Sequence, residues 1–305
     1  MKIVLTGSLG RITKPLAREL IWDGHAVTVI SSRAEMETAI KELGASAAIG
    51  RLKDVDFLTT TFRDADAVYC MTPMPDLWDA RLDLVAYYQA FGPRYLEAIR
   101  RSNVGRVVHL SSVGAHMAKG NGILRYAHEI EGVLHPLPAG VSVTFMRPVG
   151  FYDNLLALIP AIKQSGAISS NYGGDDQKPW VSPVDIASAC AEELTSSRPQ
   201  ARKIRYVASD ELSCHEVARL LGTAIGKPDL KWHLIPDHQM LDTLTKAGMN
   251  PTTAQGFVEM NGSMHSGKLY EDYHRVRPAL GKVKMRDFAE DFARAYYQES
   301  LEKAG

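Results

Sequence analysis

A glycine-rich segment near the start of the chain has the residue types that bind phosphate groups. The apolar run Lys2 to Thr6 leads directly into Gly7-Ser8-Leu9-Gly10-Arg11-Ile12-Thr13, which gives the order strand, Gly-x-x-Gly turn and helix start. Gly7 permits a tight turn, and Gly10 lets the backbone approach a pyrophosphate at the helix N-terminus, where amide groups point at the ligand. Thr13 occupies the third glycine position and weakens the motif without removing the phosphate site. Turn glycines alone are often structural, but this placement between a strand and a helix predicts a dinucleotide site.

The end of the second predicted strand bears on which dinucleotide binds. The run Val29-Ile30-Ser31-Ser32-Arg33 contains no Asp or Glu, the residue that holds the ribose 2′-hydroxyl in NAD enzymes. The two hydroxyls of Ser31 and Ser32 and the guanidinium of Arg33 suit a 2′-phosphate, since arginine binds phosphate through two parallel hydrogen bonds. Arg11 is a second candidate for the same phosphate. The sequence therefore favours NADP(H) over NAD(H); the alternative is that both arginines are solvated surface charges.

An alternation of strands and helices in the first half supplies the elements that would position these residues. Helical stretches, in which apolar residues recur at three- and four-residue spacing, separate short β-rich runs. Because such crossovers have one handedness, the pattern predicts an α/β fold with a doubly wound parallel Rossmann sheet. The predicted strands are Lys2 to Thr6, Ala26 to Ser31, Ser46 to Ile49, Ala67 to Met71, Arg106 to Leu110 and Ser142 to Met146. The predicted helices are Ile12 to Trp22, Ala34 to Leu43, Arg81 to Arg101 and Ile123 to Leu134.

The second half is predicted to add a smaller, mainly helical region on the substrate side. A turn-rich segment, Ser169 to Pro179, is followed by capped helix starts at Ser182 and Ser213 and by one strand near Lys231 to Ile235. The chain ends in an amphipathic aromatic stripe that is expected to serve packing, formed by Phe288, Phe292 and Tyr296. We predict a dinucleotide-binding core at 1–155 with return segments at about 180–208, and a C-terminal region at 156–179 and 209–305.

Composition excludes several classes of function. The 305 residues carry 35 Lys and Arg against 35 Asp and Glu, so no global field attracts nucleic acid or an anionic membrane. Cys70, Cys190 and Cys214 are far apart, which fits a reducing compartment better than a zinc site or a disulfide scaffold. The N-terminal apolar run is too short for a signal peptide, and no stretch approaches the roughly 20 apolar residues of a membrane span. We expect a cytoplasmic protein without a metal, since Arg219 stands where His215-Glu216 would need a second histidine.

With these motifs, the chain resembles the NmrA-like group of atypical short-chain dehydrogenases, which includes bacterial quinone reductases and triphenylmethane reductases. The resemblance covers nearly the whole chain. Besides the glycine segment, it rests on Val107 to Ser112, Glu131 to Leu134, Val143 to Pro148, Phe151 to Asn154, Trp180 to Ala187 and Leu212 to Val217.

The resemblance implies a set of cofactor contacts at the carboxyl ends of the strands. It places Gly7, Ser8, Leu9, Gly10, Arg11 and Ile12 along the dinucleotide, and Arg33 near the adenosine ribose. It places Met71, Thr72 and Pro73 beside the cofactor, and Ser111 and Ser112 under the nicotinamide ribose. The segment that would flank the nicotinamide is Pro148, Val149, Gly150 and Phe151.

The catalytic pair of typical short-chain dehydrogenases is incomplete in this chain. They use Tyr-x-x-x-Lys, in which the lysine lowers the pKa of the tyrosine, but here Ile130 follows Tyr126 at the lysine position. Without the lysine, a phenol with a pKa of about 10 is a poor base at neutral pH. Some family members carry Lys or His one turn before the glutamate matched by Glu131, and His128 is displaced by one residue from that position. Tyr126, Ser112 and His128 are therefore the catalytic candidates. The alternatives are packing or substrate contact for Tyr126 and a half-exposed surface position for His128.

Other histidines and the aromatic residues have two interpretations. His109 lies within a strand and is expected in the core, whereas His116 follows Ser112 and is a candidate for the pocket. The residues predicted to line a substrate pocket are Tyr152, Asn154, Trp180 and Trp78, with filling of the join between core and cap as the alternative.

Two functions remain open. The first is an NADPH-dependent reductase of a quinone, dye or similar electron-poor small molecule, in which hydride passes directly from nicotinamide and no general acid is required. The second is a NAD(P) sensor without turnover that regulates a partner protein, with the basic stretch Lys268 to Arg286 as a contact surface. A homodimer is also open, whereas a sugar-nucleotide epimerase is disfavoured because the required base is missing. The closer match to the bacterial enzymes favours the reductase.

Overall fold

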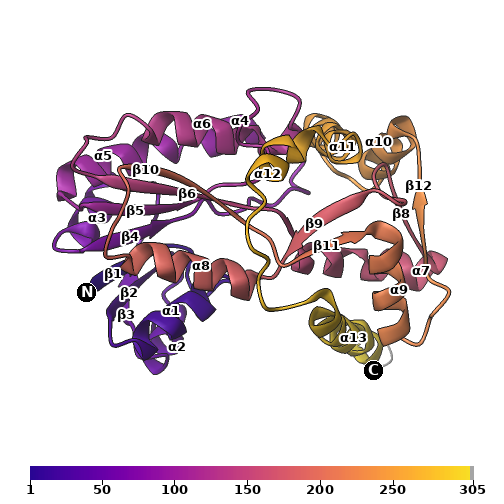
Figure 1. Ribbon diagram of the computed structural model, residues 1–305, viewed down its shortest axis with the longest axis horizontal. Helices are drawn as coiled ribbons and strands as arrows, with labels where there is room; N and C mark the ends of the chain where they lie inside the picture. Colours follow the sequence, from indigo (N-terminus) through magenta and orange to yellow (C-terminus); the bar gives the residue numbers. More distant parts are fainter. Residues whose placement is uncertain (303–305) are drawn as a thin grey trace.

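A seven-stranded parallel sheet forms the centre of the computed structural model, which describes residues 1–302 (Figure 1). The strand order is β10-β6-β5-β4-β1-β2-β3, so the chain reverses direction across the sheet between β1 and β4. This is the predicted doubly wound fold, in which ligands bind beyond the carboxyl ends of the strands at the switch point. The strands are β1 (Lys2–Leu5), β2 (Ala26–Ser31), β3 (Ser46–Ile49), β4 (Ala67–Cys70), β5 (Arg106–Leu110), β6 (Ser142–Pro148) and β10 (Arg202–Val207).

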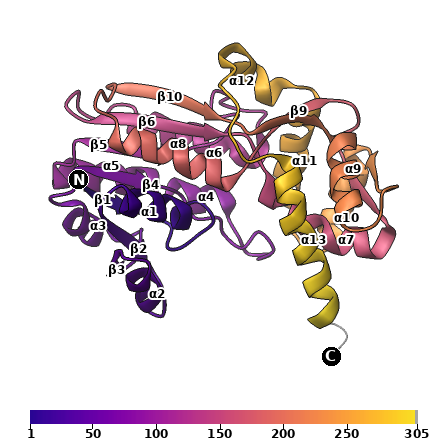
Figure 2. The same ribbon diagram turned by 60° about the horizontal axis from the view of Figure 1, so that its bottom comes forward.

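Helices cover both faces of the sheet because its strands are apolar on both sides. Val4 and Val68 point to one face and their neighbours Leu5 and Tyr69 to the other, as the two-residue period of a strand requires. Figure 2 shows the second of these faces turned forward, with α1 and α8 lying across it. That face carries α1 (Thr13–Trp22), α2 (Met36–Glu42) and α8 (Pro183–Thr195). The first face carries α3 (Val55–Phe62), α4 (Leu84–Gln89), α5 (Gly92–Ser102) and α6 (Arg125–Leu134).

The remaining elements form a smaller region at one end of the sheet (Figure 1). A three-stranded sheet, β11-β9-β7, and a parallel pair, β8 and β12, pack with helices around a separate apolar cluster. Phe288, Phe292 and Tyr296 are buried in that cluster, so the predicted packing role of the stripe is confirmed. The strands are β7 (Gly150–Phe151), β8 (Ala167–Ser170), β9 (Gln177–Val181), β11 (Asp210–Ser213) and β12 (Lys231–Leu234). The helices are η2 (Tyr152–Leu158), α7 (Ile159–Ser165), α9 (Cys214–Ala224), α10 (Asp237–Lys246), α11 (Pro251–His265), η3 (Lys268–Tyr270), α12 (Glu271–Val276) and α13 (Met285–Glu302).

Several predicted boundaries are confirmed and one long helix is wrong. The Ser182 hydroxyl accepts from Val184 N at 3.2 Å, and Ser213 forms a full capping box with Glu216, as expected. The predicted helix Arg81 to Arg101 is instead two helices, since the Asp83 side chain caps a start at Leu84 and the chain breaks before Gly92. The last three residues of the predicted C-terminal region, 303–305, lie outside the described part of the chain.

Candidate functional site

The turn between β1 and α1 requires glycine at position 7. Gly7 has φ +95°, and a Cβ there would stand 2.8 Å from the Thr13 Oγ1 atom and 3.0 Å from a Met71 side-chain carbon. The Thr13 hydroxyl donates to the Thr6 carbonyl at 2.9 Å and so joins the start of α1 to β1. The usual motif has a third glycine at this position, which allows the helix and the strand to pack closely. No side chain caps α1, but Lys14 N donates to the Gly10 carbonyl at 3.0 Å and Pro15 has no N–H group, so an anion here would have to meet the amides at the very start of α1 and in the turn before it. The local geometry fits a pyrophosphate.

A cavity of about 480 Å³ opens beside this turn, next to the ends of β1, β2 and β4. It brings together Gly7, Ser8, Ser31, Ser32, Met71 and Pro73, all predicted cofactor contacts from three separate parts of the sequence. The Ser8 hydroxyl donates to the Ser31 hydroxyl oxygen at 3.0 Å, which joins the glycine turn to the end of β2.

Two basic residues that line this cavity were not predicted from the sequence. Arg51 and Lys53 follow β3 and reach the same space, and the Lys53 ammonium lies 4.7 Å from the centre of the Tyr87 ring. The sequence signal that could have indicated these two residues is their position as a basic pair directly after the short strand β3. By contrast, the Arg33 side chain is 61% exposed with its Nε 3.9 Å from a Glu35 carboxylate oxygen, and it does not line the cavity. The cationic groups that line the cavity therefore come from the segment after β3, and the end of β2 contributes the Ser31 and Ser32 hydroxyls.

Arg11 does not point toward the end of β2. Its guanidinium lies 3.0 Å from the Asp153 carboxylate and donates to the Asp153 carbonyl at 3.2 Å. The burial of Asp153 raises its pKa, and the charge of Arg11 opposes that shift. Arg11 thus links the glycine turn to η2, the segment after β7 in the smaller region.

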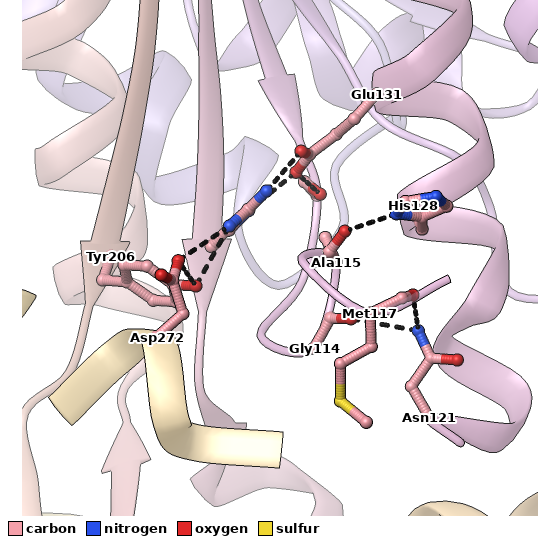
Figure 3. A network of polar contacts seen from close by, with 10 residues as sticks. Gly114, Ala115, Met117, Asn121, His128, Glu131, Tyr206 and Asp272 are labelled. Carbon is pink, nitrogen blue, oxygen red and sulfur yellow. Dashed lines mark hydrogen bonds and ion pairs between the residues drawn. The ribbon is translucent and has the colours of Figure 1, made fainter. Parts of the chain in front are cut away.

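A buried polar network stands behind the ends of β5 and β6 (Figure 3). The Ser111 hydroxyl donates to Glu131 Oε1 at 2.5 Å, and the Arg147 guanidinium binds both Glu131 oxygens at 2.9 and 2.6 Å. Arg147 also reaches Asp272 on α12 at 3.1 Å, and the Tyr206 hydroxyl donates to the same carboxylate at 2.7 Å. Burial disfavours the charge on Arg147, but the hydrogen bonds and charge of Glu131 outweigh this and raise its pKa. The network holds the Ser111 side chain in place. Arg147 is followed directly by Pro148, which is predicted to flank the nicotinamide.

The catalytic candidates occupy different surroundings. The Tyr126 ring stacks on Tyr88 with centres 4.0 Å apart, and burial raises its pKa to about 12. This geometry supports the packing alternative, because the raised pKa leaves even less phenolate at neutral pH to act as a base. His128 Nδ1 lies 2.9 Å from the Ala115 carbonyl, as Figure 3 shows. Ser112 is half-buried directly after Ser111. Within residues 1–302, no hydrogen bond joins the side chains of Ser112, Tyr126 and His128, and their catalytic role stays a prediction.

The four predicted pocket residues divide into two kinds. Tyr152 is buried with its hydroxyl donating to Asp210 at 2.9 Å, and buried Trp180 donates from Nε1 to the Leu212 carbonyl at 3.1 Å. Both have the partners expected of packed residues in the smaller region. Asn154 is exposed, and Trp78 is 52% exposed on the segment after β4.

His109 and the three cysteines are buried residues. His109 is fully buried in β5, and burial lowers its pKa to about 4, so it is a neutral core residue. The three cysteines are unpaired and buried. Within residues 1–302, no cluster of three His, Cys, Asp or Glu side chains could hold a metal ion. No helix in the same range combines the length and apolar character needed to cross a membrane.

Comparison with known proteins gives matches along almost the whole chain. The chain is 24% identical over 300 residues to a (4-alkanoyl-5-oxo-2,5-dihydrofuran-3-yl)methyl phosphate reductase of Streptomyces griseus, covering 97% of this chain and 100% of that protein. It is 24% identical over 295 residues to an NAD(P)H azoreductase of Xenophilus azovorans, covering 96% of this chain and 97% of that protein.

A solved structure supports the fold. The NADPH-dependent quinone oxidoreductase QOR2 of Escherichia coli, in complex with NADPH, superposes with a TM-score of 0.78 at 16% identity, covering 95% of this chain and 99% of that one. The model of the NmrA-like family matches residues 1–287, which include the glycine turn, the cavity and the buried network. The chain belongs to the NmrA-like family.

Proposed function

We propose that the protein is an NADPH-dependent reductase that passes hydride directly to a quinone or a similar electron-poor small molecule. The observation that carries the proposal is the cavity in which the Gly7 turn, the hydroxyls of Ser8 and Ser31 and the cations of Arg51 and Lys53 meet. These groups suit a phosphorylated dinucleotide, because backbone amides and cations bind phosphate oxygens. The names of the azoreductase and quinone oxidoreductase relatives support the same class of reaction.

The preference for NADPH rests on charge near the adenosine side. Arg51 and Lys53 line the cavity, and no carboxylate is among its lining residues. A carboxylate would bind the 2′-hydroxyl of NADH and repel the 2′-phosphate of NADPH. Arg33, exposed beside Ser32, adds a third cation that the phosphate could recruit.

Direct hydride transfer agrees with the lack of a positioned acid. When bound, NADPH supplies the hydride, and the chain supplies orientation and an apolar surface. Leu9, Met71 and Phe151 are partly buried apolar residues that pack against the main core, and they would supply part of this surface. The reduced quinone leaves as an oxyanion that solvent can protonate, so Tyr126 need not leave its stack on Tyr88.

A non-catalytic NAD(P) sensor is the second candidate, and the exposed basic residues of the 268–286 stretch favour it. Lys268, Arg277 and Lys282 are exposed and could contact a partner protein. The sensor and the reductase share the cofactor cavity and differ in turnover.

One experiment separates the two. Purified protein is titrated with NADPH and NADH by fluorescence, and quinones and azo dyes are then added while the absorbance of the reduced nicotinamide is followed. The reductase predicts tighter NADPH binding and oxidation that depends on the acceptor. Tight binding without oxidation across the whole acceptor panel would support the sensor instead.

A further inference from the structure

Lys53, one of the two cations that line the cofactor cavity, has its ammonium group over two aromatic rings. The nitrogen lies 4.7 Å from the centre of the Tyr87 ring and 5.4 Å from the centre of the Phe91 ring. Both distances are within the roughly 6 Å over which a ring face attracts a cation. Phe91 itself lines the cavity, so the ammonium lies beside the cavity wall.

The two rings belong to a separate part of the chain and are themselves held in place. Tyr87 lies on α4, and Phe91 is the residue directly before α5. Their ring centres are 5.3 Å apart, and Phe91 is only 2% exposed. Burial raises the pKa of Tyr87 above its ordinary value, so its ring is uncharged at neutral pH. The ammonium therefore rests on a neutral ring pair in a fixed position.

The main chain of Lys53 is held by the same region. The Arg94 side chain on α5 donates from Nε to the Lys53 carbonyl at 3.0 Å and from Nη1 to the Ala90 carbonyl. The next residue, Asp54, caps α3 by accepting from Phe57 N at 3.0 Å. Both the backbone of Lys53 and the end of its side chain are thus restrained.

Arg51, the other cation of the cavity, has no comparable support. Among residues 1–302, its guanidinium forms no hydrogen bond, ion pair or ring contact. A lysine side chain is flexible, and ordering it on binding costs conformational entropy. Because the two rings already restrict Lys53, a ligand has less of this side chain to order when it binds.

We propose that Tyr87 and Phe91 are positioning residues that hold the Lys53 ammonium for the extra phosphate of NADPH. An ammonium group has three N–H donors, so it can rest on a ring face and still donate to phosphate oxygens. NADH lacks this phosphate, and the ring pair therefore favours NADPH alone. The inference rests on the proposed function, because it takes the cavity to be the NADPH site. It adds that α4 and the start of α5 act on cofactor preference through Lys53.

The test is a double-mutant cycle between Tyr87 and Lys53, in which the Kd values of NADPH and NADH are measured by fluorescence titration of the full-length protein. Tyr87→Leu removes the ring and should weaken NADPH binding about two- to fivefold, as expected for one exposed cation–π contact. It should leave NADH binding nearly unchanged. In the Lys53→Gln background, Tyr87→Leu should have no further effect, because the cation that it positions is gone.

Two variants serve as controls. Tyr87→Phe keeps the ring and removes a hydroxyl that makes no hydrogen bond within residues 1–302, so it should restore NADPH binding to the wild-type level. Val85→Ala changes an exposed side chain of α4 that does not line the cavity, and it should bind NADPH normally. Urea unfolding of each variant confirms that it is folded.

A second measurement follows the ammonium group itself. Lysines are labelled by reductive ¹³C-methylation, which keeps their charge, and the signal absent from Lys53→Gln belongs to Lys53. The ring current of Tyr87 should place this signal upfield, and Tyr87→Leu should move it downfield.

The proposal is overturned if Tyr87→Leu binds NADPH as tightly as the wild type, or if it weakens both cofactors equally. It is also overturned if the effect persists in the Lys53→Gln background, or if Tyr87→Phe binds as poorly as Tyr87→Leu. The proposed function fails on a different result, NADPH that binds but is not oxidised by any acceptor, and the cycle still tests Lys53 there. Wild-type protein that binds neither cofactor would overturn both.

Discussion

The Arg147 guanidinium holds both carboxylate oxygens of Glu131, at 2.9 and 2.6 Å, with side chains only 5% and 10% exposed. The pair connects α6 to β6, and through Asp272 it reaches α12 in the smaller region. Ser111, which is predicted to lie under the nicotinamide ribose, donates a hydrogen bond to Glu131. Pro148, which is predicted to flank the nicotinamide, directly follows Arg147 in the chain. The buried ion pair beside the candidate site is therefore formed by two separate elements, α6 and β6.

Breaking this pair from one side should destabilise the fold strongly. Arg147→Met leaves the Glu131 carboxylate buried without its cation, which typically costs roughly 3–5 kcal/mol. Urea unfolding of the variant should show this loss in the free energy of unfolding. The double variant Arg147→Met with Glu131→Leu should recover much of the loss, since no unpaired charge remains. Equal stability of Arg147→Met and the wild type would contradict the structural role.

The glycine turn makes a sharp prediction about cofactor binding. Gly7→Val should abolish NADPH binding, because its side chain meets Thr13 and Met71 and its φ of +95° disfavours a branched residue. The matched control is Gly24→Ala, which has φ +81° but open space around its Cβ. Gly24→Ala should lose about 1 kcal/mol of stability from the backbone and bind NADPH normally. Fluorescence titration distinguishes the two, and NADPH binding by Gly7→Val would count against the site.

The basic residues after β3 should determine the preference for NADPH. Arg51→Gln and Lys53→Gln should each weaken NADPH binding by roughly tenfold, as expected for the loss of a charged hydrogen bond, and should leave NADH binding nearly unchanged. Arg63→Gln, an exposed arginine outside the cavity, is the control. Parallel titrations with both cofactors measure the effect. If both cofactors weaken equally, these residues bind the shared part of the dinucleotide.

His109 should make stability depend on pH. Burial lowers its folded-state pKa to about 4, below the ordinary value of 6.5, so its contribution is fully present above pH 6.5. As the pH falls from 6.5 toward 4, the unfolded chain gains a proton that the folded chain excludes, and about 3 kcal/mol is lost. His109→Leu should flatten this part of the profile of unfolding free energy against pH. An unchanged slope would show that His109 protonates freely in the fold.

The parts of the site that depend on local order were predictable from the sequence. The Gly7 turn follows from the succession of strand, glycines and helix, and Ser31 follows from the end of the next strand. The doubly wound sheet was predicted for the same reason, because its strands are short apolar runs. β10 was missed, since Arg202, Lys203 and Arg205 hide the strand pattern at the sheet edge, where lysines and arginines are tolerated.

The parts that depend on long-range packing could not be predicted. Arg51 and Lys53 reach the cavity because β3 pairs with β2, and Arg11 meets Asp153 although 142 positions separate them. Tyr126 stacks on Tyr88, a residue of another helix, and the sequence indicated packing for Tyr126 only as an alternative to a catalytic role. A basic pair after a short strand was a weak signal for Arg51 and Lys53, but the partner of each of these side chains is a consequence of the tertiary fold.

The most direct test of the account is a single turnover. Protein saturated with NADPH is mixed rapidly with benzoquinone, and the reaction is repeated with NADPH deuterated at the transferred position. Direct hydride transfer predicts oxidation of the bound cofactor and a measurably slower rate with deuterium, because the carbon–hydrogen bond breaks in the observed step. Bound NADPH that remains reduced in the presence of benzoquinone and the other acceptors would contradict direct hydride transfer.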